Sequence, residues 1–235
     1  MSRRTTAYLE LADWRRRISA LYAAVRTLAA DDPTCAWQHW CRTRETMFRE
    51  HPQSPLPLER RASFTAHHFP YDPALRVAVT VDLDVRSDDE AADGGEVRGD
   101  GHREQEGIPL SGTADGSIAL QRVGTVVVPF VAGERRLELY WMGGYGDGLF
   151  LSFRDLTNGI DTYGGGRYLL DAAKSADLGL AGHGDGVGLD DLHRLTLDFN
   201  FAYHPSCAWD PQWVCPLVAR ENYLDIMVQG GEQLS

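Results

Sequence analysis

The spacing of apolar residues changes once along this chain, and that change constrains the fold more than any other feature. Over the first fifty residues apolar side chains recur at steps of three and four, which is typical of an amphipathic helix. From about residue 64 the period becomes two, as in half-buried strands. The helical stripe consists of Leu11, Trp14, Ile18, Leu21, Tyr22, Val25 and Leu28. We therefore predict an α+β protein in which helices come first and strands follow.

The helical part is predicted to be two helices with a sharp break between them. Asp32 is suited to cap a helix N-terminus, and Pro33 favours the first helical position, so the second helix should begin there and run to about Glu50. One side of this helix carries Trp37, Trp40, Cys41, Arg44 and Phe48. An aromatic stripe at helical spacing is usually core, so we expect it to pack on the strands.

The remaining segments are predicted strands without long helices between them. Alternation favours strands over residues 76–85, 118–129, 135–142, 193–203 and 223–228. Such a series predicts an antiparallel sheet that forms a β-barrel or β-sandwich core. We expect residues 1–62 to be a helical segment packed on a β domain of residues 63–235. The acidic stretch 87–107 has few large apolar groups and is predicted to be a mobile loop.

Composition narrows the choice of partners and of compartment. The chain has 235 residues, 43% of them hydrophobic, and a net charge of −11, which argues against nucleic acid as a partner. No apolar run is long enough for a membrane span or a signal peptide, so we expect a cytoplasmic protein without a membrane partner. Lys174 is the only lysine, which we attribute to the codon bias of a GC-rich genome.

A hairpin is predicted at Asn158-Gly159, because this dipeptide favours a tight turn between runs of β-forming residues. Three consecutive glycines at 164–166 indicate a bulge, a bend or the close approach of another backbone or ligand. Arg154 and Arg167 bracket this place and could receive a carboxylate or phosphate. The alternative, which we favour, is that both arginines pair with local acids such as Asp155 and Asp161.

Polar residues of these segments are the candidates for chemistry. Asp198 and Asn200 should share one face of a strand, since they are two residues apart. Possible acid–base groups are Asp198, Glu221 and Tyr203, and possible ligand-binding groups are Arg154, Tyr163, Arg167, Asn200 and Asn222. We predict that Arg154 and Arg167 point to one region near Asp198 and Asn200. The alternative is a buried polar network that fixes the fold.

Two of the four cysteines lie in a proline- and tryptophan-rich loop that should hold them together. Cys207 and Cys215 could be packed free thiols, a disulfide or redox pair, or part of a metal site. We predict Cα atoms within about 7 Å of each other. His204 is a third candidate ligand, but no convincing fourth is present, so we predict no metal site.

The motifs of this half resemble those of the DUF1684 family of uncharacterised bacterial and archaeal proteins. The resemblance rests on the Phe-Arg-Asp-x-Thr-x-Gly run at 153–159, the Thr-Tyr-Gly-Gly-Gly-Arg-Tyr-Leu run at 162–169, the Leu-Asp-Phe-Asn run at 197–200 and the Cys-Pro pair at 215–216. Upstream it includes 51–56 and 69–73, so it covers most of the chain. The family implies no activity. Where its relatives resemble Ala-Tyr-Asn-Pro, this chain has His204.

Two hypotheses of function remain. The first is a β protein that binds a small, anionic molecule, which could also be an acid–base enzyme. The second is a non-catalytic accessory protein whose aromatic surface docks a protein partner. Nucleophile-elbow, P-loop, dinucleotide-binding and HExxH motifs are absent from the sequence, and no cofactor is indicated. A pocket lined by the polar candidates would favour the first hypothesis, and an exposed aromatic patch the second.

Overall fold

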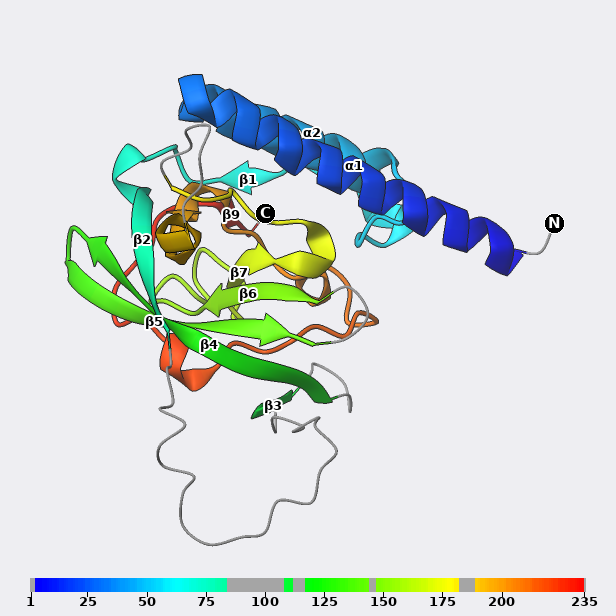
Figure 1. The fold of residues 1–235 in the computed structure, drawn as a ribbon. Helices are drawn as coiled ribbons and strands as arrows, with labels where there is room; N and C mark the ends of the chain where they lie inside the picture. The colour runs from blue at the N-terminus through cyan, green and yellow to red at the C-terminus, as the bar shows by residue number, and fades with distance from the viewer. Residues whose placement is uncertain (1–2, 84–107, 112–116, 144–146, 182–188, 235) are drawn as a thin grey trace, which may run out of the picture.

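The computed structural model describes residues 3–83, 108–111, 117–143, 147–181 and 189–234 and has an α+β architecture (Figure 1). Two N-terminal helices lie across one side of a curled antiparallel sheet. The acidic segment 87–107, predicted to be mobile, lies outside the described residues. Within the described ranges, none of the helices combines the length and apolar character needed to cross a membrane.

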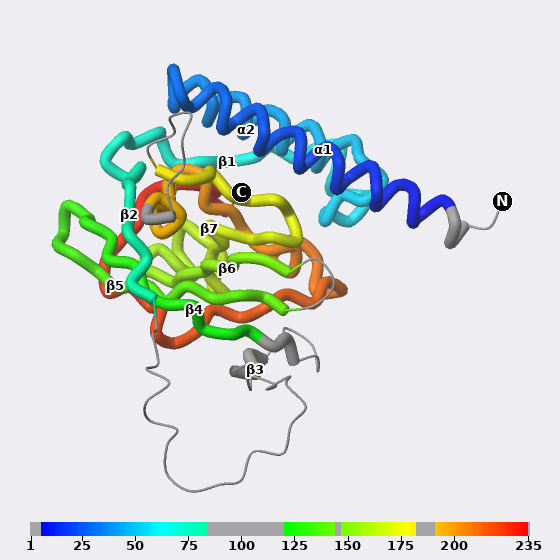
Figure 2. The backbone as a smooth tube through the Cα atoms, in the orientation of Figure 1, coloured from blue at the N-terminus to red at the C-terminus, as the bar shows by residue number. Residues whose placement is uncertain are grey.

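The helical prediction is confirmed at its central boundary. Helix α1 spans Arg3–Asp31 and α2 spans Pro33–Glu50. Asp32 caps α2, since its carboxylate accepts hydrogen bonds from the backbone N–H groups of Thr34 and Cys35. The two helices lie side by side, as the tube view shows (Figure 2). The remaining helical elements are the short α3 (Leu58–Arg61) and 3-10 turns at Pro73–Leu75, Ala172–Lys174, Leu189–His193, Phe199–Phe201, Ser206–Ala208 and Arg220–Asn222.

The main sheet contains most of the predicted strands. Its strands are β2 (Arg76–Leu83), β3 (Ile108–Ser111), β4 (Ser117–Phe130), β5 (Gly133–Met142), β6 (Gly148–Phe153), β7 (Arg167–Asp171) and β8 (Arg194–Asp198). Six of them follow the order β7-β6-β5-β4-β2-β8, and β3 pairs with β4. Each of these pairings is antiparallel. The sheet curls into a half-barrel; a closed barrel or a sandwich is not confirmed.

The curl brings the two ends of the sheet near each other. Tyr168 in β7 and Tyr203, five residues beyond the end of β8, exchange two backbone hydrogen bonds of 2.9 and 3.0 Å. A second, two-stranded sheet joins β1 (His67–His68) to β9 (Glu232–Gln233), a pairing that the sequence pattern did not predict. The chain after Asp198 is therefore held between the sheet and the helices.

Two apolar clusters explain why the layers adhere. The first lies inside the curl of the sheet and includes Val126, Leu139, Leu197 and Phe199. The second joins helix to sheet through side chains such as Leu21, Val25 and Trp40 of the helices and Phe150 and Tyr168 of the strands. Trp40 has no exposed surface. Burial of such large side chains stabilises each by about 1.5–3 kcal/mol relative to exposure, which accounts for the docking of the helices.

Three strand predictions need correction. Asn158-Gly159 is not a two-residue hairpin turn, because β6 and β7 are joined by the longer loop 154–166. The strand predicted at 193–203 ends at Asp198, whose carboxylate accepts from the N–H of Asn200 and starts a 3-10 turn. Residues 223–228 alternate in burial but form no strand, because Leu224 and Ile226 share backbone hydrogen bonds with the irregular loop 154–156 and not with a strand.

Candidate functional site

The two arginines predicted to converge have separate environments. Arg167 is fully buried, and its Nη2 donates to Asp155 Oδ2 at 3.1 Å and to the Val228 carbonyl at 2.9 Å. Its Nη1 donates to the Gly230 carbonyl. Arg154 instead stacks its guanidinium on the ring of Tyr223 and donates to the Tyr223 hydroxyl at 3.0 Å. The convergence near Asp198 is therefore wrong, and only Arg167 follows the alternative of pairing with a local acid.

The glycines at 164–166 allow the backbone to pack closely beside the buried ion pair of Arg167 and Asp155. Gly166 has φ of +96°, and a Cβ there would lie 2.7 Å from the carbonyl oxygen of Phe153 and 2.6 Å from a methyl of Val218. No other residue fits such a close approach. The close approach predicted for these glycines is therefore an approach to protein backbone, and it allows the Arg167 side chain to lie in the core.

Asp198 and Asn200 are capping groups rather than members of one strand face. Asp198 accepts from Arg76 Nη1 at 3.2 Å and from the Tyr71 hydroxyl at 3.4 Å. Asn200 bridges Asp72, accepting from its N–H and donating to its carbonyl. Burial raises the pKa of Asp198, although its hydrogen bonds oppose the shift. The arrangement closes the turn that precedes β2 onto the end of β8.

The remaining candidates also lie apart. Glu221 is exposed. Asn222 is fully buried and bonds to both backbone groups of Glu138 and to the Ser152 carbonyl, which ties the 3-10 turn at Arg220–Asn222 to the sheet. Tyr163 is half-buried and its hydroxyl lies 3.8 Å from Cys207 Sγ. Among the candidate acid–base and ligand-binding residues, only Tyr203 lines the cavity beneath the N-terminal helices.

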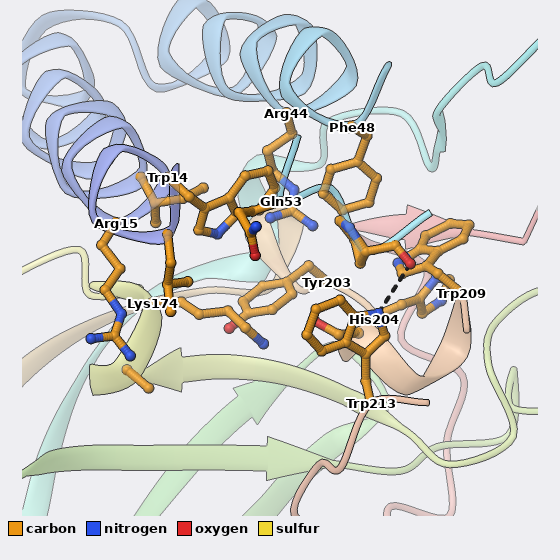
Figure 3. Close-up of a pocket in the computed structure, with 15 residues that line it drawn as sticks. Trp14, Arg15, Arg44, Phe48, Gln53, Lys174, Tyr203, His204, Trp209 and Trp213 are labelled. Atoms are coloured by element: carbon orange, nitrogen blue, oxygen red, sulfur yellow. Dashed lines mark hydrogen bonds between the residues drawn. The ribbon is translucent and has the colours of Figure 1, made fainter. Parts of the chain in front are cut away.

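That cavity has a volume of about 230 Å³ and lies between the two N-terminal helices and the turns after β7 and β8 (Figure 3). Its lining is Leu11, Trp14, Arg15, Ile18, Arg44, Phe48, Gln53, Pro55, Ala173, Lys174, Tyr203, His204, Ser206, Trp209 and Trp213. The lining combines aromatic rings with three cations and contains no carboxylate. The carboxylates that pair with Arg44 and Lys174, which are Glu232 and Asp171, are not part of this lining.

Arg44 is the most buried of the three cations. Its Nε and Nη2 donate to Glu232 Oε1 at 2.9 and 2.5 Å, so Nη1 is not engaged by that carboxylate. The guanidinium carbon lies 4.8 Å from the ring centroids of Trp40 and Tyr203. Burial alone would raise the pKa of Glu232, but the charge of Arg44 lowers it below its ordinary value. The pair is therefore ionised and positions the guanidinium at the wall of the cavity.

Lys174 is held in a similar way on the opposite side. Its Nζ lies 3.3 Å from Asp171 Oδ2 and 5.2 Å from the centroid of Tyr203. The Tyr203 hydroxyl donates to the same Asp171 oxygen at 2.8 Å. Burial, together with the charge of Asp171, raises the pKa of Tyr203 well above its ordinary value. Tyr203 is thus a neutral phenol, and the acid–base role predicted for it has no support in its surroundings.

Two neighbouring rings of the lining carry polar atoms without a partner among the described residues: His204 at Nδ1 and Trp209 at Nε1. Both residues are buried, and their ring centroids are 5.7 Å apart. Burial lowers the pKa of His204 to about 4, so its ring is neutral at pH 7. Because Nε2 accepts the N–H of Tyr163 at 3.2 Å, the ring proton is on Nδ1. Both unpartnered atoms are therefore hydrogen-bond donors.

Sequence reasoning missed most of this cavity. Trp14 and Arg44 were assigned to core stripes, and Lys174 was attributed to codon bias. The signals that could have found them were the single lysine and the His204 substitution in a family motif, both of which fall in the lining. Within the described ranges no three His, Cys, Asp or Glu side chains gather as a metal site.

Cys207 and Cys215 are free thiols in the part of the chain that the structure describes, with Cys207 partly exposed and Cys215 buried. The distance expected between their Cα atoms stays a prediction. The segment between them carries Trp209 and Trp213, which form one wall of the cavity. The thiol pair therefore lies beside the cavity without lining it.

Comparison with known proteins gives a family and a related structure. A family model described as a protein of unknown function, DUF1684, matches residues 64–233. A solution NMR structure of an uncharacterised protein from Haloarcula marismortui is similar with a TM-score of 0.56 and 28% identity, covering 88% of this chain and 96% of that one. No curated protein matches.

Proposed function

Because this chain belongs to the DUF1684 family of proteins of unknown function, we propose its function from the cavity itself: it binds a small anionic molecule with a flat aromatic or apolar body. The observation that carries this proposal is the composition of the lining, in which the described residues include three cations and no carboxylate. A cation in such a wall would pair with a ligand carboxylate or phosphate through charge-assisted hydrogen bonds.

The unpartnered donors support the same class of ligand. A buried donor without an acceptor costs about 1–3 kcal/mol, so His204 Nδ1–H and Trp209 Nε1–H favour a ligand that supplies acceptor oxygens. Arg44 Nη1 is available for the same purpose, because Glu232 engages only the other two nitrogens. An anion supplies acceptors for donors of this kind, whereas a cationic ligand would meet the like charges of Arg15, Arg44 and Lys174.

The size and the rings of the cavity define the rest of the ligand. A volume of about 230 Å³ is below the roughly 300–1,000 Å³ of sites for drug-sized molecules, so one or two rings would fill it. Trp14, Phe48, Trp209 and Trp213 offer faces and edges on which a flat body could stack. Catalysis is not part of the proposal, since Tyr203 keeps its proton and the unprotonated nitrogen of His204 already accepts the N–H of Tyr163.

The alternative, an accessory protein that docks a partner through aromatic side chains, has less support. The tryptophans that could form such a surface are Trp37 and Trp40 on α2, and Trp209 and Trp213 in the segment after β8. Trp40 is fully buried and Trp209 is buried, so neither centre presents an exposed aromatic patch.

The test is calorimetric titration with three ligands that share an indole ring and differ in charge: indole-3-acetate, indole-3-acetamide and tryptamine. We expect the acetate to bind about tenfold more tightly than the amide, as a charge-assisted hydrogen bond exceeds a neutral one by about 1.4 kcal/mol. Tryptamine should bind weakest. Equal affinity of the three, or no binding of the acetate, would overturn the proposal.

A matched pair of variants locates the effect. Lys174→Met removes a cation of the lining and should weaken indole-3-acetate binding about fivefold to tenfold. Arg154→Met removes a cation that stacks on Tyr223 outside the cavity and should leave the affinity unchanged. Thermal melting of both variants would verify that they are folded. The same loss in both would indicate a general charge effect and contradict the cavity as the site.

A further inference from the structure

The three cations of the cavity lining differ in how their charges are compensated. Arg44 donates to Glu232 at 2.5 Å, and both side chains are buried. Lys174 lies 3.3 Å from the carboxylate of Asp171. Arg15 belongs to the same lining but has no ion pair or side-chain hydrogen bond with the residues that the structure describes. The positive charge that this lining offers without a counter-charge from the protein is therefore the charge of Arg15.

Helix α1 directs Arg15 to the cavity through its place on the helical surface. Arg15 follows Leu11 by four residues, and side chains at this spacing lie on the same side of a helix. Leu11 and Arg15 both line the cavity, whereas the next residue, Arg16, is exposed and is not part of the lining. Figure 3 shows Arg15 and Lys174 at one end of the lining and His204 at the other. The uncompensated charge is thus confined to one end of the cavity.

The other end suits an uncharged group. The charge of Arg44 is already compensated by Glu232, so a ligand carboxylate buried there would find no counter-charge of its own, which is strongly unfavourable. His204 Nδ1 and Trp209 Nε1 have no partner among the described residues. A carbonyl or hydroxyl oxygen would supply the acceptor that these donors lack without adding a charge.

We propose that Arg15 determines the charge and the orientation of the ligand, which is a flat monocarboxylic acid with an uncharged oxygen acceptor at the end remote from its carboxylate. The carboxylate lies at the Arg15 end and the uncharged oxygen at the His204 end. The inference rests on the proposed function, because it concerns the same cavity. It adds the number of acid groups, their position and the residue that recognises them. A phosphate monoester fits less well, since its charge at pH 7 approaches −2.

Three para-substituted benzoates of nearly equal shape test the uncharged end. The substituent of 4-acetylbenzoate carries a neutral oxygen acceptor, that of 4-isopropylbenzoate carries none, and that of terephthalate is a second carboxylate. In calorimetric titrations of the native protein at pH 7, we expect 4-acetylbenzoate to bind about fivefold more tightly than 4-isopropylbenzoate, the effect of one neutral hydrogen bond. Terephthalate should bind at least about tenfold more weakly than 4-acetylbenzoate, because its second charge is uncompensated. Tightest binding of terephthalate would overturn the monocarboxylic class, and tightest binding of 4-isopropylbenzoate would overturn the oxygen acceptor.

Two neighbouring arginines provide the matched test of orientation. In Arg15→Met the affinity for indole-3-acetate should fall about threefold to fivefold, the range of a partly exposed ion pair, while the affinity for the uncharged indole-3-acetamide should not change. High salt should diminish this difference, because it screens an exposed pair. Arg16→Met removes the same charge from the next position of α1 and should change neither affinity. Equal losses in the two variants would indicate a general charge effect and overturn the role of Arg15.

Failure of this inference and failure of the proposed function give different results. If indole-3-acetate binds more tightly than its amide and Arg15→Met keeps that preference, the cavity binds anions but Arg15 does not orient them. If neither indole-3-acetate nor any of the benzoates binds, both proposals are wrong. Arg15 and Arg16 are both exposed on α1, so the variants should fold, which melting curves verify. The benzoate series on the native protein decides the ligand class even if a variant fails to fold.

Discussion

Replacing Arg167 by methionine should destabilise the protein far more than the same replacement at Arg154. Arg167 is fully buried and donates to Asp155 and to the carbonyls of Val228 and Gly230. Without it, a carboxylate with no exposed surface loses its counter-charge, which costs about 3–5 kcal/mol in buried pairs. Arg154 stacks on the half-exposed Tyr223, and such contacts contribute about 0.5–1 kcal/mol.

The assay is equilibrium unfolding in urea, followed by tryptophan fluorescence, with both variants compared with the native protein at pH 7. A double variant, Arg167→Met with Asp155→Leu, should regain part of the loss, because the stranded charge is then removed. Two results would refute the role of Arg167 in a structural ion pair. One is an equal loss of stability in the Arg167 and Arg154 variants. The other is a double variant that is less stable than Arg167→Met by the full cost of Asp155→Leu alone.

Two further predictions concern stability. Burial lowers the pKa of His204 to about 4, whereas a histidine in the unfolded chain has a pKa of about 6.5. Between these two pH values the unfolded state binds more protons than the folded state, so the free energy of unfolding falls as the pH drops. Between pH 7.5 and pH 5 the variant His204→Gln should lose about 2 kcal/mol less free energy of unfolding than the native protein. Unfolding curves at both pH values measure this, and an equal pH dependence in the variant and the native protein would contradict it. Asn222→Ala should cost about 2–3 kcal/mol, since it strands backbone groups of Glu138 and Ser152, and a midpoint equal to native would contradict that role.

The predictions from sequence succeeded where the determining physics is local. Asp32 and Pro33 define the start of α2 by capping and by backbone geometry, and both effects act within a few residues. The period of two predicted β2, β4 and β5 because one face of each strand is buried. The family resemblance likewise followed from contiguous motifs and is confirmed by the match over residues 64–233.

The site could not be predicted because its parts come from distant segments. Arg44 reaches the cavity from α2, Lys174 from the turn after β7, and His204 and Trp209 from the chain after β8. Tertiary packing alone brings these segments together. Residues 223–228 illustrate a related failure: their burial alternates as in a strand, but the partner for their backbone is the irregular loop 154–156. Periodicity reports burial and does not report hydrogen-bond partners.

The central claim is that this cavity receives an anionic ring, and the indole N–H resonances of the six tryptophans test it most directly. The protein would be labelled with ¹⁵N at tryptophan and titrated with indole-3-acetate to millimolar concentration. The account predicts shifts for Trp209, whose Nε1–H lacks a partner among the described residues, and for Trp14 and Trp213, which share the lining. Trp37, whose Nε1–H is also unpartnered but lies outside the lining, should not move. Unchanged resonances of Trp209, or shifts confined to Trp37, would contradict the account.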